Sequence, residues 1–393
     1  MIAILLAPFY VLANIYIVRW LIKWTYACSN IFKNKAVRNI IILLYVFFAS
    51  SFIIGFFLQV RFIKVIGNYW LGVVQYILLT ILIADLIRII IKKFKLVSNK
   101  VIESKKVFAI VGLICLTTVF SLSTYGVLHA KKIVYTNYNV KINKKVENIK
   151  KLKISLVSDL HLGYNSSLNH VKKMVKMINN SNSDLVVMAG DIFDNNYSSI
   201  SKPKEVISEL KKIKSKYGVY AVCGNHDIDE KILAGFTFSF KKGKKLIDSK
   251  MEEFLKDANV KLLRDETVLI DNSFYLIGRL DYHKYGIEVD KRKSIKSLTK
   301  SVDKSKPVIV LDHEPYELDA LSKNGVDLDL SGHTHNGQMF PSNLFIKMVW
   351  KNAYGKLKVG NMYSIVTSGI GVYGPNMRVL TTEEVANINV YFK

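Results

Sequence analysis

Four long apolar stretches near the start of the chain restrict its fold more than any other feature. They cover residues 2–22, 40–60, 66–91 and 107–129. Each approaches or exceeds the ~20 apolar residues that a helix needs to cross a bilayer. In hydrocarbon, a spanning segment must satisfy its own backbone hydrogen bonds, so these stretches must be helical. The sequence therefore predicts a transmembrane domain of four helices at residues 1–130, followed by a second domain at residues 131–393.

The basic residues between these stretches predict their orientation. Lys and Arg are frequent in the first and third loops, whereas the second loop has Arg61 and Lys64. Cytoplasmic loops carry an excess of Lys and Arg, which places the first and third loops in the cytoplasm. Four crossings then place both ends of the chain outside. We expect a multi-pass protein of the cell membrane whose second domain is extracytoplasmic.

The net charge of +25 has the same origin. The dense basic clusters border the apolar stretches, where membrane topology explains them, so they do not predict binding to nucleic acid. Asp85 is the one acid inside an apolar stretch, and we expect it to pair with Arg88, which follows by three residues on the same helix face. No charged side chain stands in the middle of a stretch, which disfavours a transporter.

After residue 130 the pattern changes to short β-rich runs that alternate with amphipathic segments. Runs at 152–157, 185–188 and 219–222 read as strands, and the apolar positions between 168 and 178 share one face of a helix. Strands that alternate with helices indicate an α/β sandwich. In such sheets, ligands bind beyond the carboxyl ends of the strands.

Polar fragments stand at those ends. Together they supply enough Asp, Asn and His side chains for two metal ions, and a mixture of imidazole and carboxylate suits Mn, Fe or Zn. A closed structural zinc site would instead require four ligands, commonly thiolates. Asp191 offers a carboxylate that can bridge two cations, and Asn225 a neutral oxygen. In chain order the fragments are Asp159-Leu160-His161, Gly190-Asp191, Gly224-Asn225-His226-Asp227, His313-Glu314 and Gly332-His333-Thr334-His335.

The spacing within two fragments is regular. Asp159 and His161 are two residues apart, as are His333 and His335. Residues at this spacing point to the same side of an extended segment, so we expect extended backbone at both fragments. Gly332 would permit a close approach of the chain beside His333.

The order of the fragments resembles that of the calcineurin-like metallophosphoesterase superfamily over roughly residues 150–375. The runs at 158–163 and 332–338 are similar to the bacterial membrane-anchored branch, which includes proteins similar to UDP-diacylglucosamine pyrophosphate hydrolases. The resemblance implies two β-sheets flanked by helices. It also implies a metal-dependent phosphohydrolase with two divalent metal ions, acting on a phosphate or pyrophosphate ester that is nucleotide-linked or lipid-linked.

The same resemblance implies roles for single residues. His226 would steady or protonate the leaving oxygen, and Asp227 would orient the loop. Asp191 would bridge the ions, with a hydroxide between them that attacks phosphorus. Carried over by position, one metal would be held by Asp159, His161, Asp191 and His335, and the other by Asp191, Asn225, His313 and His333.

Departures from the family pattern and rival functions also follow from the sequence. Asn195 stands where the protein Ser/Thr phosphatases of the superfamily have a phosphate-clamping Arg, which disfavours that activity. A membrane sensor or scaffold that binds a phospho-ligand without turnover is the alternative, although it would not need His226. The run Gly-Ile-Gly-Val-Tyr-Gly at 369–374 matches a dinucleotide fingerprint, but Pro375 follows at once. We expect a tight loop that closes over the metal site.

The loop charges generate a topology prediction. A reporter that is active only outside the cytoplasm should be active when it is fused after Lys393, because the positive-inside rule places that end outside. A reporter that is active only inside the cytoplasm, fused at the same residue, serves as the control. Activity of the second reporter and silence of the first would reverse the predicted orientation.

Overall fold

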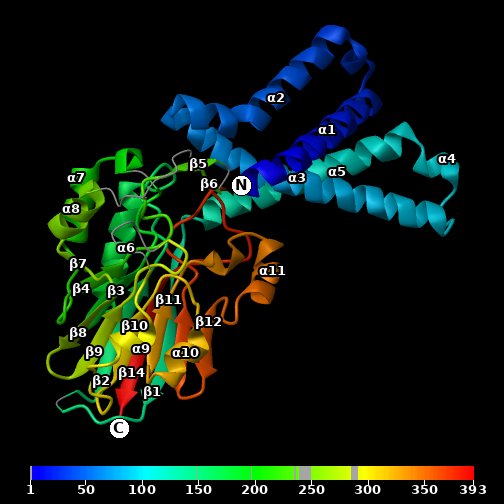
Figure 1. Ribbon diagram of the computed structural model, residues 1–393. Coiled ribbons are helices and arrows are strands. Elements are labelled where there is room, and N and C mark those ends of the chain that lie inside the picture. Colours follow the sequence, from blue (N-terminus) through cyan, green and yellow to red (C-terminus); the bar gives the residue numbers. More distant parts are fainter. Residues whose placement is uncertain (1, 148, 196, 234–235, 239–248, 285–290) are drawn as a thin grey trace. The chain divides into compact units, whose positions relative to one another are not determined.

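The computed structural model describes residues 2–147, 149–195, 197–233, 236–238, 249–284 and 291–393 (Figure 1). The chain separates into two compact units. One is formed mainly by Met1–Leu128, and the other mainly by the residues that follow. The first unit is helical and the second contains two large β-sheets.

The helical unit has four long helices, each long and apolar enough to cross a membrane by length and composition. The prediction of four long apolar helices is therefore confirmed. Short helices lie in the first and third loops. The elements are α1 (Ile2–Cys28), η1 (Asn30–Lys33), α2 (Lys35–Leu58), α3 (Arg61–Lys93), α4 (Asn99–Ile102) and α5 (Lys105–His129).

Small residues and aromatic rings bring these helices together. A Cβ atom on Gly67 of α3 would lie 2.7 Å from the Cα atom of Phe52 in α2, so glycine permits this close crossing.

Asp85 does not pair with Arg88 as expected. Its carboxylate accepts a hydrogen bond of 2.6 Å from the hydroxyl of Tyr16 in α1, and the described residues include no ion pair between Asp85 and Arg88. A neighbouring helix, which the sequence pattern does not specify, supplies the partner.

The second unit contains two mixed sheets of six strands each. The first has the strand order β1-β14-β2-β3-β4-β7 and the second the order β12-β13-β11-β10-β9-β8, while β5 and β6 form a separate pair that belongs mainly to the first unit. The strands are β1 (Ile133–Ile142), β2 (Lys151–Val157), β3 (Leu185–Ala189), β4 (Val219–Val222), β5 (Lys231–Leu233), β6 (Phe236–Phe238), β7 (Val260–Leu262), β8 (Glu266–Ile270), β9 (Phe274–Gly278), β10 (Val308–Leu311), β11 (Leu328–Ser331), β12 (Gly355–Val359), β13 (Met362–Val366) and β14 (Glu383–Phe392).

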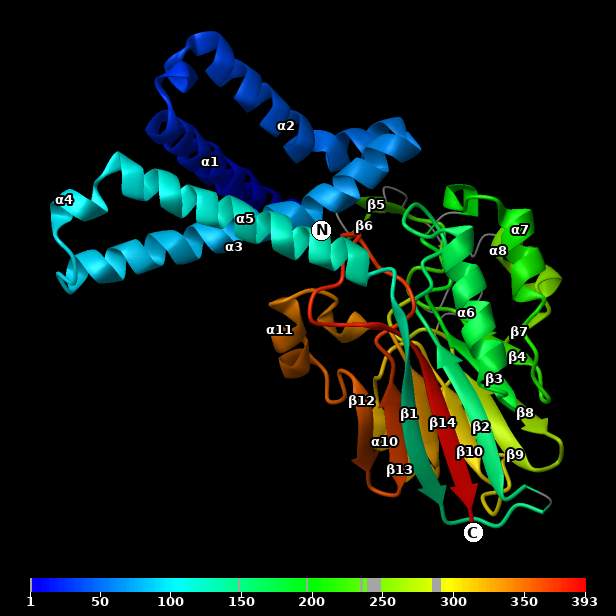
Figure 2. The ribbon, with the colours of Figure 1, turned by 180° about the vertical axis from the view of Figure 1, so that it is seen from behind.

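Helices cover the outer faces of both sheets (Figures 1 and 2). Side chains of α6, α7 and α8 pack on the first sheet, and those of α9 and α10 on the second. This confirms the predicted α/β sandwich of two sheets flanked by helices. The helices of this unit are α6 (Leu168–Asn180), η2 (Tyr197–Ser199), α7 (Pro203–Leu210), α8 (Ser249–Asp257), α9 (Ile295–Leu298), α10 (Leu318–Lys323), η3 (His335–Gly337) and α11 (Ser342–Val349).

The two sheets meet through a buried apolar layer. One core cluster contains residues of both sheets, and those named here are inaccessible to solvent: Leu152, Ile154 and Leu156 of β2, Leu276 of β9 and Ile309 of β10. The strands β2, β3 and β4 run parallel within the first sheet, as β9, β10, β11 and β13 do in the second. Because parallel strands end at the same edge, the loops that follow them gather there.

Candidate metal centre

Every predicted ligand stands in a loop that follows one of these parallel strands. Asp159 and His161 follow β2, Asp191 follows β3, and Asn225 follows β4 in the first sheet. From the second sheet, His313 follows β10, and His333 and His335 follow β11. The structure thus brings together side chains from both sheets, separated by up to 176 residues in the sequence.

The backbone at the two regularly spaced fragments differs from the expectation. Asp159 and His161 have φ values of 55° and 43°, and those of His333 and His335 are 69° and 49°, so none of the four is extended. Left-handed turns, not the alternation of a strand, direct these side chains inward. Such conformations are costly for residues other than glycine and are concentrated at functional sites.

Gly332 makes the close approach that the sequence suggested. A Cβ atom at this position would lie 2.0 Å from Oγ of Ser158 and 2.5 Å from Oδ2 of Asp159. Any larger residue would displace the β2 loop, so the contact requires glycine. The backbone N–H of His333 also donates to the carboxylate of Asp159, which ties the two loops together.

The first candidate ligand group contains Asp159, His161 and His335, all buried. The Nε2 atoms of the two imidazoles are 3.1 Å apart, and Nε2 of His335 is 3.4 Å from Oδ1 of Asp159. Two ligands bound at right angles, each ~2.1 Å from one ion, would lie about 3.0 Å apart. The spacing in this group therefore fits a shared cation.

The second candidate group contains Asp191, His313 and His333. Asn225 belongs to it by geometry, because its Oδ1 atom is 3.1 Å from Nε2 of His313 and 2.9 Å from Nδ1 of His333. Nδ1 of His313 contacts the carbonyl of Ala189 at 2.8 Å, a contact that leaves Nε2 free to face the centre. Backbone carbonyls commonly orient metal-binding imidazoles in this way.

Asp191 lies between the two groups. Its Oδ2 atom is 3.2 Å from Nε2 of His313 and 3.8 Å from Nε2 of His161. Its other oxygen, Oδ1, accepts a hydrogen bond of 2.7 Å from the backbone N–H of His226. A single carboxylate oxygen within reach of both groups has the position that a bridging ligand requires.

Burial keeps most of the imidazoles neutral. It lowers the pKa of His161 and of His333 to about 4, and it lowers the pKa of His335 well below its usual value. Neutral imidazole is the form that binds metal ions. These three rings therefore have a lone pair available without the loss of a proton.

His313 and Asp191 behave differently because they face each other. Burial disfavours charge on both groups, but the nearby carboxylate raises the pKa of His313, and His313 in turn lowers the pKa of Asp191. Burial also raises the pKa of Asp159 to about 7. This cluster of carboxylates favours positive charge at its centre, as a site for divalent cations must.

His226 stands beside the groups, and Asn195 orients it. Its Nδ1 atom forms a short contact with Oδ1 of Asn195, whose amide nitrogen donates to the carbonyl of Ile228. This arrangement makes Nδ1 of His226 the donor and leaves its Nε2 for another partner. Asn195 is completely buried, so the residue that departs from the protein phosphatase pattern is a support for His226.

Asp227 holds the backbone of the loop. Its Oδ1 atom accepts a hydrogen bond from the N–H of Phe193 at 2.8 Å, and its Oδ2 atom accepts one from the N–H of Gly224 at 2.7 Å. Both oxygens thus accept hydrogen bonds from backbone N–H groups. Burial raises the pKa of Asp227 to about 8. Its position is that of a positioning residue.

The sequence did not single out the partly buried Tyr373 and the fully buried Arg378, which border the centre. The ring of Tyr373 lies 4.3 Å from that of His226 and 5.0 Å from that of His161. Arg378 donates to the carbonyls of Ser368 and Gly371 and lies 3.3 Å from Nδ1 of His335. Arg378 stands in no motif of the sequence, and the glycine-rich run that contains Tyr373 did not point to this tyrosine; both side chains reach the centre from the loop after β13.

That loop packs closely against the β2 loop. A Cβ atom on Gly369, which has a φ of 78°, would lie 2.8 Å from Cβ of Asp159. One on Gly371 would lie 2.6 Å from the carbonyl oxygen of Leu160. The glycines therefore serve close packing beside the ligand groups, and not the binding of a dinucleotide.

Comparison with known proteins supports this interpretation of the domain. Residues 152–337 match the family model of the calcineurin-like phosphoesterases. An uncharacterized metallophosphoesterase of Helicobacter pylori is 31% identical over 61% of this chain and 60% of its own length. A transmembrane protein with a metallophosphoesterase domain from Danio rerio is 29% identical, over 68% of this chain and 60% of its own length.

A shorter relative is matched over most of its length. An uncharacterized metallophosphoesterase of Aquifex aeolicus is 29% identical, over 65% of this chain and 90% of its own sequence. By contrast, the match spans about 60% of the length of the Helicobacter and Danio relatives.

The position of Asp191 generates a prediction about metal content. Asp191→Asn should leave at most one weakly held ion per chain, because a neutral amide cannot balance two dications. Elemental analysis of the purified variant measures this directly. Asp303→Asn, a change at an exposed carboxylate, is the matched control and should keep the metal content of the unaltered protein. Two ions per chain in Asp191→Asn would exclude the bridging role.

The contact between Asn195 and His226 generates a second prediction. Asn195→Ala removes the oxygen that orients the imidazole, so turnover should fall about 10–100-fold while both ions stay bound, as for other residues that support a metal site. Asn195→Asp keeps an oxygen at this position and should retain more activity than Asn195→Ala. Equal activity of the two variants would show that the side-chain oxygen has no part in orienting His226.

Proposed function

We propose a function from the premise that residues 152–337 form a domain of the calcineurin-like metallophosphoesterase superfamily, whose members are metal-dependent phosphohydrolases. The protein is a membrane-anchored phosphoesterase with two divalent metal ions. Its substrate is a phosphate or pyrophosphate ester near the membrane surface, linked to a nucleotide or to a lipid. The single observation that carries the proposal is the placement of Asp191 between two ligand groups.

The ligands divide between the ions as the two groups suggest. Asp159, His161 and His335 would hold one ion, and Asn225, His313 and His333 the other, with Asp191 shared. Mn, Fe or Zn fits this donor set. Two such ions, when bound, supply Lewis acidity and lower the pKa of water, which produces a nucleophile at neutral pH.

His226 supplies the chemistry at the leaving group. Asn195 engages its Nδ1 atom, so its Nε2 atom is available to a substrate oxygen. When the ring is protonated, Nε2 donates a proton to the departing oxygen and Nδ1 keeps its contact with Asn195. The adjacent ring of Tyr373 covers one side of the imidazole and limits the access of water.

The class of substrate follows from what surrounds His226. The protein Ser/Thr phosphatase pattern has an Arg at the position of Asn195, and here the amide is buried and bound to His226. This supports a non-protein substrate. The four apolar helices and the charges of their loops support a site on the outer side of a membrane, in the branch similar to UDP-diacylglucosamine pyrophosphate hydrolases.

The leaving-group arrangement also separates an enzyme from a phospho-ligand sensor. A sensor would need the two metal-ligand groups, but it would not need a His226 imidazole whose Nδ1 atom is held by Asn195 so that Nε2 faces the substrate. The position of His226 therefore supports turnover over binding alone.

A substrate screen tests the proposal. The purified full-length chain would be assayed with nitrophenyl monoesters and diesters, nucleotide-linked pyrophosphates and lipid phosphates, with Mn, Fe, Zn and Mg each tested separately. Hydrolysis that requires an added metal and is lost in Asp191→Asn is the expected result. Tight binding of a phosphate compound with no turnover under any metal would favour the sensor.

His226 provides a prediction about the chemical step. His226→Ala should retain both ions and lose about 10²–10⁴-fold in rate, the usual contribution of a positioned acid. The loss should be smaller for nitrophenolate, which needs little protonation, than for an alkoxide leaving group. Asp303→Asn, at an exposed carboxylate that precedes β10, is the control and should keep full activity. An equal loss for all leaving groups would mean that His226 binds phosphate instead of protonating the departing oxygen.

A further inference from the structure

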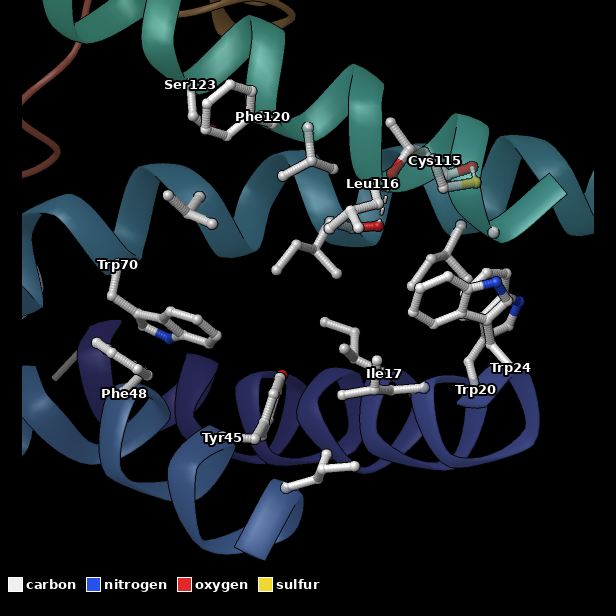
Figure 3. Close-up of a pocket in the computed structure, with 18 of the residues that line it drawn as sticks. Ile17, Trp20, Trp24, Tyr45, Phe48, Trp70, Cys115, Leu116, Phe120 and Ser123 are labelled. Atoms are coloured by element: carbon white, nitrogen blue, oxygen red, sulfur yellow. Dashed lines mark hydrogen bonds between the residues drawn. The ribbon is translucent and has the colours of Figure 1, made fainter. Parts of the chain in front are cut away.

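The helical unit contains a cavity that the phosphoesterase site does not use. Its volume is about 490 Å³, within the ~300–1,000 Å³ range of small-molecule sites. Residues from all four long helices line it (Figure 3). Trp20 and Trp24 lie at one end, whereas Trp70 and Ser123 lie toward the other.

The wall of the cavity presents almost no polar atoms. The polar groups of most lining residues are turned to partners elsewhere in the helices, so carbon atoms and ring faces remain toward the interior. The hydrogen bonds are Trp24 Nε1 to the Ala109 carbonyl at 3.0 Å, Trp70 Nε1 to Tyr10 Oη at 3.1 Å, Tyr45 Oη to Asn14 Oδ1 at 2.7 Å, and Thr80 Oγ1 to the Tyr76 carbonyl at 2.8 Å.

Trp20 and Ser123 also leave the cavity wall without exposed polar atoms. Neither the indole nitrogen of Trp20 nor the hydroxyl of Ser123 has a hydrogen-bond partner within the described ranges, and both atoms are covered by their neighbours. A water molecule in a protein needs about 2–4 polar partners, and an ion needs more. The cavity therefore suits neither water nor an ion.

The dimensions of the cavity fit one extended chain. Along α5 the lining residues run from Gly112 to Ser123, which at ~1.5 Å per residue is about 16 Å. This length is about half of the ~30 Å hydrocarbon core of a bilayer, the depth of one leaflet. A volume of about 490 Å³ over that length gives a cross-section of about 30 Å².

The cross-section decides how much can enter. Carbon atoms in contact lie ~3.5–4.0 Å apart, so this long and narrow space admits a hydrocarbon chain that lies along the helices. A further helix, with a diameter of ~10 Å, is too wide. We propose that this cavity binds one acyl chain of a membrane phospholipid, between the four helices and parallel to them.

The bilayer around the helices is the source of the acyl chain. The proposal rests on the membrane-spanning role stated above, and not on the phosphoesterase activity. In a bilayer the cavity meets a solvent of acyl chains, and an empty hollow would forfeit the dispersion contacts of its wall. Phospholipid is the hydrocarbon at highest concentration there.

Tryptophan fluorescence tests the proposal, because three of the four tryptophans of the chain line the cavity. The full-length protein would be placed in phosphatidylcholine vesicles whose acyl chains carry bromine at mid-chain. Strong quenching is expected for the unaltered protein. Val73→Phe and Val119→Phe each fill part of the cavity and should lose much of that quenching.

Val46→Phe is the matched control. Val46 is 50% exposed on α2 and does not line the cavity, so its replacement should leave the quenching unchanged. Quenching that is equal in all four proteins would overturn the proposal. Flotation of the protein with the vesicles tests membrane insertion separately, so a failure of the spanning role is distinguished from an empty cavity.

A second measurement needs no substitution. Phosphatidylcholine with a photoreactive group at mid-chain should cross-link to Cys115 and Val119, which line the cavity and are each 8% exposed. On the same helix, Leu113 and Ile114 are 58% and 59% exposed and report contact with the surrounding lipid. Cross-links confined to Leu113 and Ile114 would show that no acyl chain enters.

Discussion

The carboxylate of Asp191 is the interaction on which the candidate centre depends. It is buried between imidazoles from both sheets, and its second oxygen accepts the backbone N–H of His226. A carboxylate in this setting is costly unless positive charge faces it. Asp191 therefore needs cations or their ligands close to it. These ligands come from the loops that follow β2, β3, β4, β10 and β11.

Support around this carboxylate is built in layers. Asp227 fixes the β4 loop through two backbone N–H groups, and Asn195 fixes the ring of His226. Arg378 holds the loop after β13 through its carbonyls and lies beside His335. These contacts reduce the freedom of the ligand groups, which is how a metal site sets geometry beyond its direct ligands.

The helical unit has the surface of a protein that is surrounded by hydrocarbon and not by water. Its helices have large apolar side chains exposed on their outer faces, as segments in hydrocarbon do, and join through glycine contacts and hydrogen bonds such as that between Tyr16 and Asp85. The same rule explains why an apolar cavity is acceptable there. In water such a hollow would be a defect, whereas among acyl chains it is a place that a chain can occupy.

The sequence by itself determined which segments are helices in the first unit, the alternation of strands and helices in the second, and the residues that stand at the strand ends. These features depend on local composition and on the period of apolar residues. It also selected Asp159, His161, Asp191, Asn225, His313, His333 and His335 by their order along the chain. The tertiary structure alone decided how they converge. The left-handed turns at Asp159 and His161 depend on loop conformation. The other contacts join residues that are distant in sequence: Asn195 with His226, Tyr373 with His226, Arg378 with His335, and Tyr16 with Asp85. No local pattern encodes such contacts, because they arise where separately formed elements pack.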